Sequence, residues 1–191
     1  MEVILVRHGE TEWSRTLKHT GWTDEPLTDL GREQADRVGA ALRGRAFALV
    51  LTSPLRRAYE TCRLAGFGDV AQARDDLREW NYGDYEGRKT ADIRKEVPGW
   101  TIWTGGVPNG ETLEQLGARA DRVLDEARAA NGDVLIFGHG HMLRILAARW
   151  LALDAAAGRL FALDSATLST LGYERETAVI REWNLPIESA A

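Results

Sequence analysis

Three short segments of this sequence carry cationic and imidazole side chains that could bind an anion and attack it. Arg7 and His8 are adjacent, Arg56 and Arg57 are adjacent, and His139 lies between two glycines. Arginine forms bidentate, charge-assisted hydrogen bonds with phosphate oxygens. A neutral imidazole can attack phosphorus and form a phosphohistidine. The combination predicts a phosphoryl-transfer site in which arginines supply the positive charge and no metal is needed.

Cleavage of a phosphate ester also requires an acid, because the leaving alkoxide must be protonated. Glu79 precedes Trp80 and lies close to Tyr82 in the sequence. Desolvation by these rings, together with the charge of a bound phosphate, is expected to raise the pKa of this carboxyl group and keep it protonated near neutral pH. The alternative is an ordinary solvated carboxylate in a loop.

The elements that must position these residues are strands. The apolar runs Val3–Val6, Phe47–Leu51 and Val134–Phe137 predict three buried parallel strands, and each basic or histidine segment follows one of them. By itself, an Arg-His pair at a strand end is typical of ordinary surface residues without a function in binding or catalysis. Because ligands bind beyond the carboxyl ends of such strands, the convergence of three segments at one sheet edge favours a site.

The rest of the chain predicts helices on both sides of that sheet. Asp29 is expected to cap a helix that ends near Gly44, with Leu30 on its buried face, and Pro54 is expected to start a helix that runs to Leu64. Further helices are expected over 113–130, stopped by Asn131-Gly132, and over about 141–151. Segments 168–173 and 178–183 predict an antiparallel hairpin. The expected fold is a three-layer α/β/α sandwich with a mostly parallel central sheet and one antiparallel edge, in a single domain of residues 1–191.

Residues 77–110 interrupt the alternation of strands and helices. This stretch is rich in Gly and Pro and is expected to be a lid-like insertion with one short helix near Thr90–Val97. Its aromatic residues either line a substrate pocket or pack the insertion onto the domain. They are Trp80, Tyr82, Tyr85, Trp100 and Trp103.

A zinc site at His139-Gly-His141 is the rival interpretation of the third segment. The flanking Gly138 and Gly140 suggest a tight turn that points the two rings apart, and no carboxylate motif accompanies them. We therefore expect no metal, and expect His141 to be a supporting residue at a helix start. The single cysteine, Cys62, excludes a disulfide and is expected to be buried and inert.

Composition limits the function classes further. The formal charge of −5 argues against a general nucleic-acid binder. No apolar stretch approaches the roughly 18 residues of a membrane helix, and Arg7 comes too early for a signal peptide, so a cytoplasmic location is expected. A monomer and a homodimer are both compatible with the sequence.

Six motifs occur in a characteristic order along almost the whole chain. They are Arg7-His-Gly-Glu-Thr11, Thr20-Gly-Trp-Thr-Asp-Glu-Pro-Leu-Thr28, Ser53-Pro-Leu-Arg-Arg-Ala58, Glu79 with Tyr82-Gly83, Gly110-Glu-Thr112, and Gly138-His-Gly140. The chain thereby resembles the histidine phosphatase superfamily, in the branch with cofactor-dependent phosphoglycerate mutases and small acid or sugar phosphatases. Segments 19–24 and 77–87 look like those of fungal sedoheptulose-bisphosphatases and mycobacterial acid phosphatases. The resemblance implies a phosphoglycerate mutase-like fold.

The resemblance also implies roles for individual residues. His8 is the phosphorylated nucleophile and Glu79 the proton donor, while the phosphate pocket consists of Arg7, Arg57 and His139. The motif selects Arg57 over Arg56, which is expected to face solvent. Ser14 departs from the Asn of the mutases, so its contact with phosphate, direct or through water, stays open. The expected substrate-binding set is completed by His19, Thr20, Gly21, Tyr82 and Gly140.

The expected function is a metal-independent, cofactor-free phosphomonoesterase that acts on small phosphorylated metabolites: sugar phosphates, bisphosphates or a broad range. A phosphoglycerate mutase is the alternative. Mutases of this family exclude water with a longer insertion and tail, whereas only 31 residues separate Glu79 from Glu111 here and the sequence ends soon after Trp183. A non-catalytic phospho-ligand binding module is less favoured, because every matching catalytic position is filled.

Overall fold

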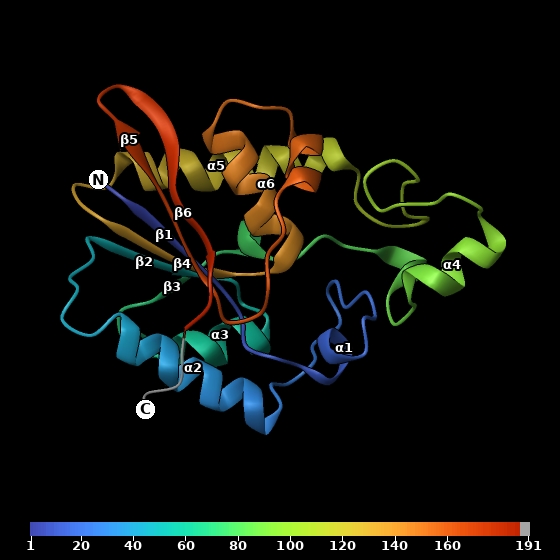
Figure 1. Ribbon diagram of the computed structural model, residues 1–191, viewed down its shortest axis with the longest axis horizontal. Helices are drawn as coiled ribbons and strands as arrows, with labels where there is room; N and C mark the ends of the chain where they lie inside the picture. Colours follow the sequence, from blue (N-terminus) through green and yellow to red (C-terminus); the bar gives the residue numbers. More distant parts are fainter. Residues whose placement is uncertain (188–191) are drawn as a thin grey trace.

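A six-stranded sheet forms the centre of the computed structural model, which describes residues 1–187 (Figure 1). The strand order is β3-β2-β4-β1-β5-β6. Strands β1 (Val3–Arg7), β2 (Leu49–Thr52), β3 (Gln72–Ala73) and β4 (Val134–Gly138) run parallel. Strands β5 (Leu168–Glu174) and β6 (Thr177–Leu185) form the antiparallel edge. The predicted mostly parallel sheet with one antiparallel edge is confirmed.

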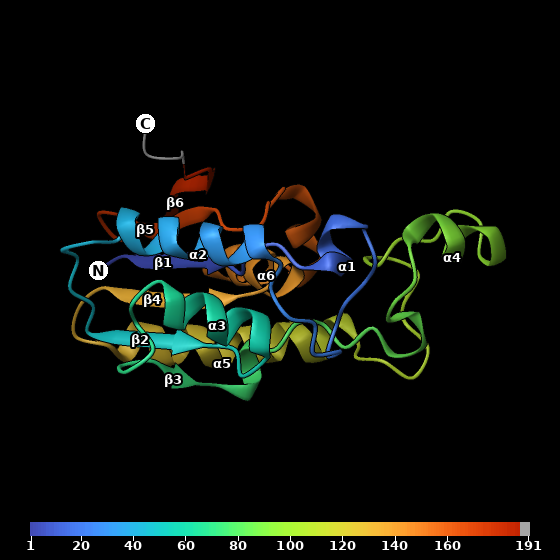
Figure 2. The ribbon, with the colours of Figure 1, turned by 90° about the horizontal axis from the view of Figure 1, so that it is seen from below.

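Helices cover both faces of the sheet, as Figures 1 and 2 show. One face packs against α2 (Asp29–Ala41) and α3 (Arg56–Leu64), and the other against α5 (Leu113–Ala129) and α6 (Gly140–Trp150). In β1, Val3 and Leu5 belong to the core on the α5 and α6 side, whereas Ile4 and Val6 belong to the core on the α2 and α3 side. A strand buried on both faces needs an uninterrupted apolar run, which is why the central strands were recognisable.

Several predicted boundaries were wrong in detail. Thr28, not Asp29, is the N-cap of α2: its hydroxyl accepts a hydrogen bond from the backbone N–H of Gly31 at 3.0 Å. Leu30 is 42% exposed, so it does not lie on the buried face. Helix α3 begins at Arg56 rather than at Pro54. The short, exposed strand β3 was not predicted, since two residues are too few to carry a periodic signal.

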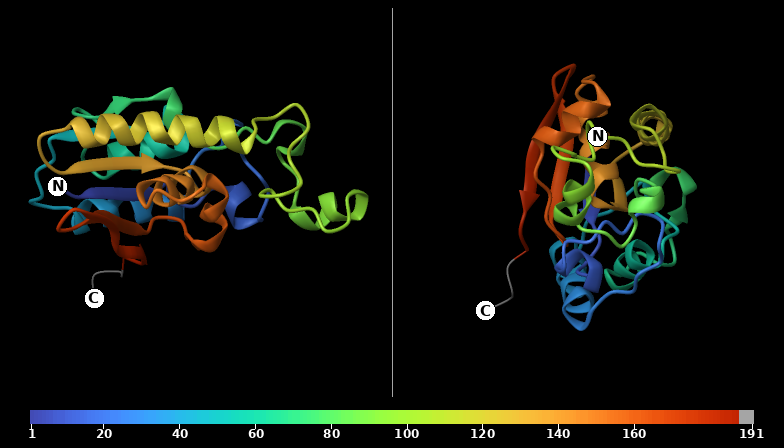
Figure 3. Two further views of the ribbon diagram at one scale, coloured as in Figure 1. Left: turned by 90° about the horizontal axis from the view of Figure 1, so that it is seen from above. Right: turned by 90° about the vertical axis from the view of Figure 1, so that its right-hand side faces the viewer.

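Residues 77–110 lie beyond the carboxyl ends of the parallel strands (Figure 3). They contain α4 (Thr90–Glu96), which confirms the predicted short helix. Trp80, Tyr85 and Trp100 are buried in the core, and Trp103 packs against it, so these rings hold the insertion down. Shorter elements are the helix α1 (Glu12–Arg15) and the 3-10 helices Asp75–Leu77, Gly83–Tyr85 and Ala155–Leu160. Across residues 1–187 no helix combines the length and apolarity needed to span a membrane.

Candidate active site

A cavity of about 560 Å³ opens where the central strands end, in the size range typical of small-molecule sites. Of the eleven residues predicted for the site, all except His139 line this cavity. His139 is fully buried behind it, with its ring centroid 5.2 Å from that of His8. Arg57 is 1% exposed, whereas the side chain of Arg56 is 60% exposed and lies near Glu60.

His8 is held as a neutral imidazole at the end of β1. Its backbone N–H donates to the carbonyl of Gly138, which ties it to β4. The Nδ1 atom lies 2.7 Å from the carbonyl of Gly9, so Nδ1 carries the proton and donates it there. Burial, followed by the charges of Arg57 and Arg7, lowers the pKa of His8 well below 6.5. The Nε2 atom is left with a free lone pair, the form that a nucleophile requires.

His139 is oriented by Ser53 across the ends of β4 and β2. Its Nε2 lies 2.7 Å from the Ser53 hydroxyl. The other partner of that hydroxyl is the N–H of Leu55 at 3.2 Å, which can only donate, so His139 Nε2 is the partner that can accept the hydroxyl proton. Burial, with Arg57 and His8 nearby, lowers the pKa of His139 well below its ordinary value. The neutral ring therefore carries its proton on Nδ1.

Within residues 1–187, three buried side-chain nitrogens have no hydrogen-bond partner: Arg7 Nε, Arg57 Nε and His139 Nδ1. The guanidinium groups are otherwise fixed. Arg7 donates to the carbonyl of Leu163, and Arg57 donates to the carbonyls of Gly21 and Thr23 at 2.7 and 2.9 Å. Buried donors are rarely left unpaired in folded proteins. All three belong to neighbours of His8, so unpaired donors gather beside one imidazole, as the binding of an oxyanion requires.

The side chain of Glu79 is hydrogen-bonded to the start of α6. Its carboxylate accepts hydrogen bonds from the backbone N–H groups of Trp80, His141 and Met142 at 2.9 to 3.1 Å. Burial by itself raises the pKa of Glu79, but the His141 imidazole, these amides and Arg57 outweigh it, so the pKa lies below its ordinary value. Desolvation thus acts in the predicted direction, but the predicted net rise of the Glu79 pKa is not found in this structure. The other predicted cause, the negative charge of a bound phosphoryl group, would raise the pKa of Glu79 when substrate is present.

Half-buried His141 and buried Tyr82 form a hydrogen-bonded pair next to Glu79. Burial raises the pKa of Tyr82 well above 10, so its hydroxyl is protonated and donates to His141 Nδ1 at 2.5 Å. Burial also lowers the pKa of His141 to about 4. His139 and His141 therefore have different partners, Ser53 and Tyr82. Among the described residues, no group of three or more His, Cys, Asp or Glu side chains could hold a metal ion.

Ser14 and His19 line the cavity with their polar atoms already engaged. The Ser14 hydroxyl caps α1: it accepts the N–H of Thr11 at 2.9 Å and donates to the Thr11 carbonyl at 3.0 Å. Nε2 of His19 lies 3.1 Å from the Thr90 hydroxyl, and its ring packs edge-on against Tyr82. Both side chains are thus fixed before any ligand binds.

Glu86, which was not predicted, organises the loop that holds Arg57. Its carboxylate accepts the N–H groups of Trp22 and Thr23 at 2.7 and 2.9 Å. Gly21 has φ +58°, in the left-handed region that favours glycine, and a Cβ there would lie 2.1 Å from a Glu86 oxygen and displace that carboxylate. The carbonyl oxygen of Gly21 accepts a hydrogen bond from Arg57. Gly21 was predicted to bind phosphate, and in this structure its contact is with the arginine beside the nucleophile.

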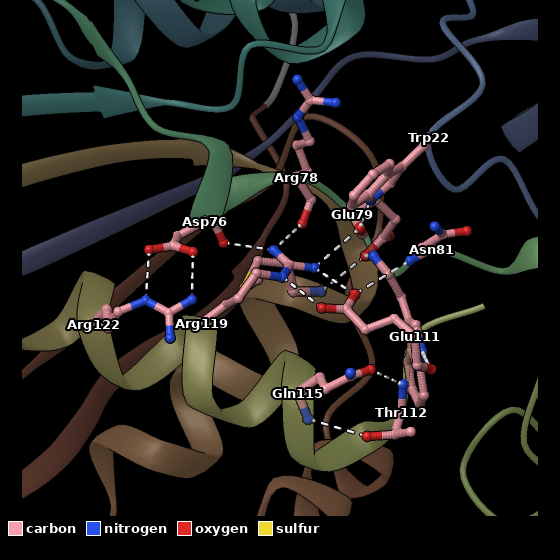
Figure 4. A network of polar contacts seen from close by, with 12 residues as sticks. Trp22, Asp76, Arg78, Glu79, Asn81, Glu111, Thr112, Gln115, Arg119 and Arg122 are labelled. Carbon is pink, nitrogen blue, oxygen red and sulfur yellow. Dashed lines mark hydrogen bonds and ion pairs between the residues drawn. The ribbon is translucent and has the colours of Figure 1, made fainter.

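Arg119 on α5 was also missed, and it fixes the backbone that carries Glu79 (Figure 4). It makes a two-pronged ion pair with Glu111, both N–O distances being 2.7 Å. It also donates to the carbonyls of Asp76, Arg78 and Glu79 at 2.6, 2.9 and 3.3 Å. No local spacing in the sequence connects Arg119 with these carbonyls, which lie about forty residues earlier in the chain.

Replacing Arg119 by Ala is expected to lower kcat for phenyl phosphate about 100-fold with little change in KM, because the Glu79 carboxylate shifts from its working position. The loss for p-nitrophenyl phosphate, whose leaving group needs less protonation, should be smaller. Arg122→Ala is the matched control: Arg122 lies on the same helix in an exposed pair with Asp76. An Arg119→Ala variant that is folded and fully active would contradict this role.

Stability is expected to fall as the pH falls below about 6.5. Burial lowers the pKa values of His8, His139 and His141, so below pH 6.5 the unfolded chain binds protons that the folded chain does not. Each histidine contributes a slope of up to about 1.4 kcal/mol per pH unit, and that of His141 ends near pH 4. Urea unfolding at pH 7, 6 and 5 measures this trend. A flat profile would contradict the buried neutral imidazoles.

A nucleophilic imidazole, buried arginines and a carboxylate at the carboxyl edge of a parallel sheet define an α/β enzyme that acts on phosphate esters. A family model agrees. The chain belongs to the histidine phosphatase superfamily, branch 1, whose model matches residues 3–186.

Relatives of this chain carry phosphatase names. An acid phosphatase of Mycobacterium tuberculosis is 40% identical over 185 residues, covering 93% of this chain and 91% of that protein. A sedoheptulose 1,7-bisphosphatase of Saccharomyces cerevisiae is also 40% identical over 185 residues, covering 78% of this chain and 67% of that protein. A "probable phosphoglycerate mutase" of Yersinia enterocolitica is 32% identical over 202 residues, covering 100% of this chain and 92% of that protein.

A solved structure of the protein that an open reading frame of Mycobacterium tuberculosis encodes superposes on this chain with a TM-score of 0.93. The two are 38% identical, and the match covers 98% of each chain. The predicted resemblance and the predicted phosphatase class are confirmed, and the mutase alternative has less support.

Proposed function

We propose that this phosphatase is a metal-independent phosphomonoesterase that forms a phosphohistidine on His8. The observation that carries the proposal is the set of three buried, unpartnered donors around His8: Arg7 Nε, Arg57 Nε and His139 Nδ1. They supply hydrogen bonds and positive charge to a phosphoryl group without a metal ion. One domain spanning residues 1–191 performs the reaction, with residues 77–110 forming part of the cavity wall.

The first step transfers the phosphoryl group to His8. Nε2 attacks phosphorus while the donors hold the equatorial oxygens, and the bond between phosphorus and the ester oxygen breaks. Glu79 gives its proton to that leaving oxygen. A substrate that binds as a monoanion supplies this proton, and the charge of the bound phosphoryl group keeps it on the carboxyl.

The second step returns the enzyme to its starting state. Glu79, now ionised, takes a proton from a water molecule whose oxygen attacks the phosphohistidine. The bond between phosphorus and Nε2 breaks, and His8 is again a neutral imidazole. Glu79 passes the proton that it took from water to the orthophosphate, which leaves as the monoanion, so Glu79 is again ionised. The lowered pKa of His8 keeps the released ring neutral, so Nε2 is free to attack the next substrate.

The substrate is a small phosphorylated metabolite, of the sugar phosphate or bisphosphate class or a broader range. Its non-reacting part contacts the cavity wall, for which we propose Ser14, His19, Thr20, Gly21, Tyr82 and Gly140. The protein needs no cofactor, acts in the cytoplasm as a monomer or homodimer, and binds neither nucleic acid nor membrane.

The function is tested by incubating the protein with p-nitrophenyl phosphate in the presence of EDTA, where steady release of phosphate is expected. Isomerisation of 3-phosphoglycerate without phosphate release would support the mutase alternative instead. Activity that disappears in EDTA would show that a metal is required. If neither compound is turned over, the result would support a non-catalytic module that only binds phosphorylated ligands.

A further inference from the structure

The two arginines beside His8 are held in place by carbonyl groups of loops. Arg57 donates to two carbonyls of a loop that Glu86 organises. Within the described part of the chain, the guanidinium of Arg7 has a single hydrogen-bond partner, the carbonyl of Leu163. The position of this phosphate donor therefore depends on whatever fixes Leu163.

The turn formed by residues 163–167 contacts Arg7 at both of its ends and comes just before β5. At the later end, the Ala166 N–H is shared between the carbonyls of Arg7 and His8 at 3.1 and 3.2 Å. Ala166 has φ +55°, a left-handed conformation that L side chains rarely adopt, so the backbone is tightly constrained here. The pairing of β5 with β1 begins only at Leu168, so the earlier end of the turn needs a support of its own.

Asn184 of β6 provides that support. Its Oδ1 accepts the backbone N–H of Asp164 at 2.7 Å, and its Nδ2 donates to the Asp164 carboxylate at 2.9 Å. An N–H can only donate and a carboxylate can only accept, so both ends of the amide are used. The backbone N–H of Asn184 donates to the Ser169 hydroxyl at 2.9 Å, which ties it to β5. Because Asp164 directly follows Leu163, this double hydrogen bond fixes the carbonyl that holds the arginine.

Strand β6 is irregular where Asn184 lies. Thr170 of β5 is opposite Glu182. Two residues earlier on β5, Leu168 is opposite Leu185, so three steps along β6 match two steps along β5. Asn184 has φ +56° within this bulge, and asparagine tolerates that left-handed conformation better than most residues. Bulges redirect side chains and are frequent next to active sites, so the backbone here directs the amide toward the turn.

We propose that Asn184 is a positioning residue for phosphate binding: by fixing Asp164 it sets the position of the Leu163 carbonyl, and through it that of the Arg7 guanidinium. Neither Asn184 nor Asp164 lines the cavity, so their effect on a bound phosphoryl group passes through Arg7. This inference rests on the proposed function for the role of Arg7. It adds to the site a residue from the antiparallel edge of the sheet, outside the six motifs of the sequence.

The variant Asn184→Gly tests this role, because glycine keeps the left-handed backbone and removes the amide. Calorimetry with orthophosphate should show about tenfold weaker binding, since the Arg7 donor is displaced, and kcat/KM for p-nitrophenyl phosphate should fall at least tenfold. Glu182→Ala is the matched control. Glu182 lies on the same strand, and its hydrogen bond goes to Thr170 at 3.2 Å rather than to the turn, so both quantities should stay within about threefold of the native protein.

An exchange of the two side chains separates geometry from charge. In N184D two carboxylates face each other, so orthophosphate binding should weaken at least tenfold. Adding D164N places one amide and one carboxylate there again in reversed order, and N184D/D164N should return to within about threefold of the native protein. N184G changes no charge, so its loss has a geometric cause, and D164N should not rescue it. N184D/D164N that binds orthophosphate no better than N184D would contradict the proposed pairing.

An Arg7→Ala background distinguishes positioning from a general effect on the fold. If Asn184 acts through Arg7, adding N184G to Arg7→Ala should change kcat/KM for p-nitrophenyl phosphate by less than about threefold, because residues that act through one another are not additive. An equal tenfold loss in both backgrounds would overturn the inference. Native affinity for orthophosphate in N184G would overturn it as well.

Failure of this inference is separable from failure of the proposed function, because orthophosphate binding requires no turnover. If the native protein hydrolyses no ester but N184G weakens orthophosphate binding about tenfold, the positioning role is upheld and the phosphatase mechanism is rejected. If the native protein hydrolyses esters and N184G binds orthophosphate as tightly as the native protein, the mechanism is upheld and the positioning role is rejected.

Discussion

His8→Ala is expected to abolish phosphoenzyme formation and to reduce kcat by a factor on the order of 10⁴ or more, because it removes the imidazole that attacks phosphorus. In the native protein, rapid acid or base quenching during turnover of a ³²P-labelled ester should trap a phosphoenzyme that is acid-labile and base-stable, as a phosphohistidine is. The variant should yield none.

The comparison needs proof that the variant is folded. Removing a buried imidazole leaves a cavity, so thermal unfolding and circular dichroism should accompany the kinetics. Binding of orthophosphate should persist in His8→Ala, because Arg7, Arg57 and His139 are intact. A labelled phosphoenzyme in the folded variant, or an acid-stable linkage in the native protein, would reject His8 as the nucleophile.

Glu79→Gln is expected to reduce kcat by about 10² to 10⁴-fold for alkyl phosphates, whose leaving oxygen must be protonated, and by less for p-nitrophenyl phosphate. The amide has the shape of the carboxyl group but cannot deliver the proton. The measurement is kcat against leaving-group pKa, which should have a steeper slope in the variant. Equal losses for good and poor leaving groups would show that Glu79 is not the acid.

The pH dependence follows from the same residue. Since the pKa of Glu79 lies below its ordinary value in this structure, the carboxyl is ionised at pH 5 and above, and the proton must arrive with a monoanionic substrate. The ester loses that proton near pH 6. Native kcat/KM for an alkyl phosphate should therefore be highest on the acidic side of pH 6 and fall as the pH rises through that value.

The central strands and the site at their ends could be predicted because both depend on local signals. An apolar run marks a buried strand, and the parallel-sheet rule places Arg7, Arg57 and His139 at one edge without further information. Leu30 was misplaced because the phase of a helix is poorly defined in its first turn, where Thr28 provides the cap.

Contacts between distant loops could not be predicted. Glu86 and Arg119 act through backbone groups that lie 40 to 64 residues away in the sequence, and no local spacing predicts such pairs. The lowered pKa of Glu79 was missed for the same reason. The amides of His141 and Met142 reach its carboxylate only because α6 packs against the insertion.

The first turn of α6 has a consequence for how substrate preference can change. His139 is the N-cap of this helix, and the amides of the next residues hold Glu79. The phosphate anchor lies at the start of this helix and the carboxylate of the acid is hydrogen-bonded to its first turn, so their separation does not depend on the cavity wall opposite. Substitutions in the segment around α4 can therefore redirect the protein to new metabolites while the spacing needed for bond cleavage is inherited unchanged.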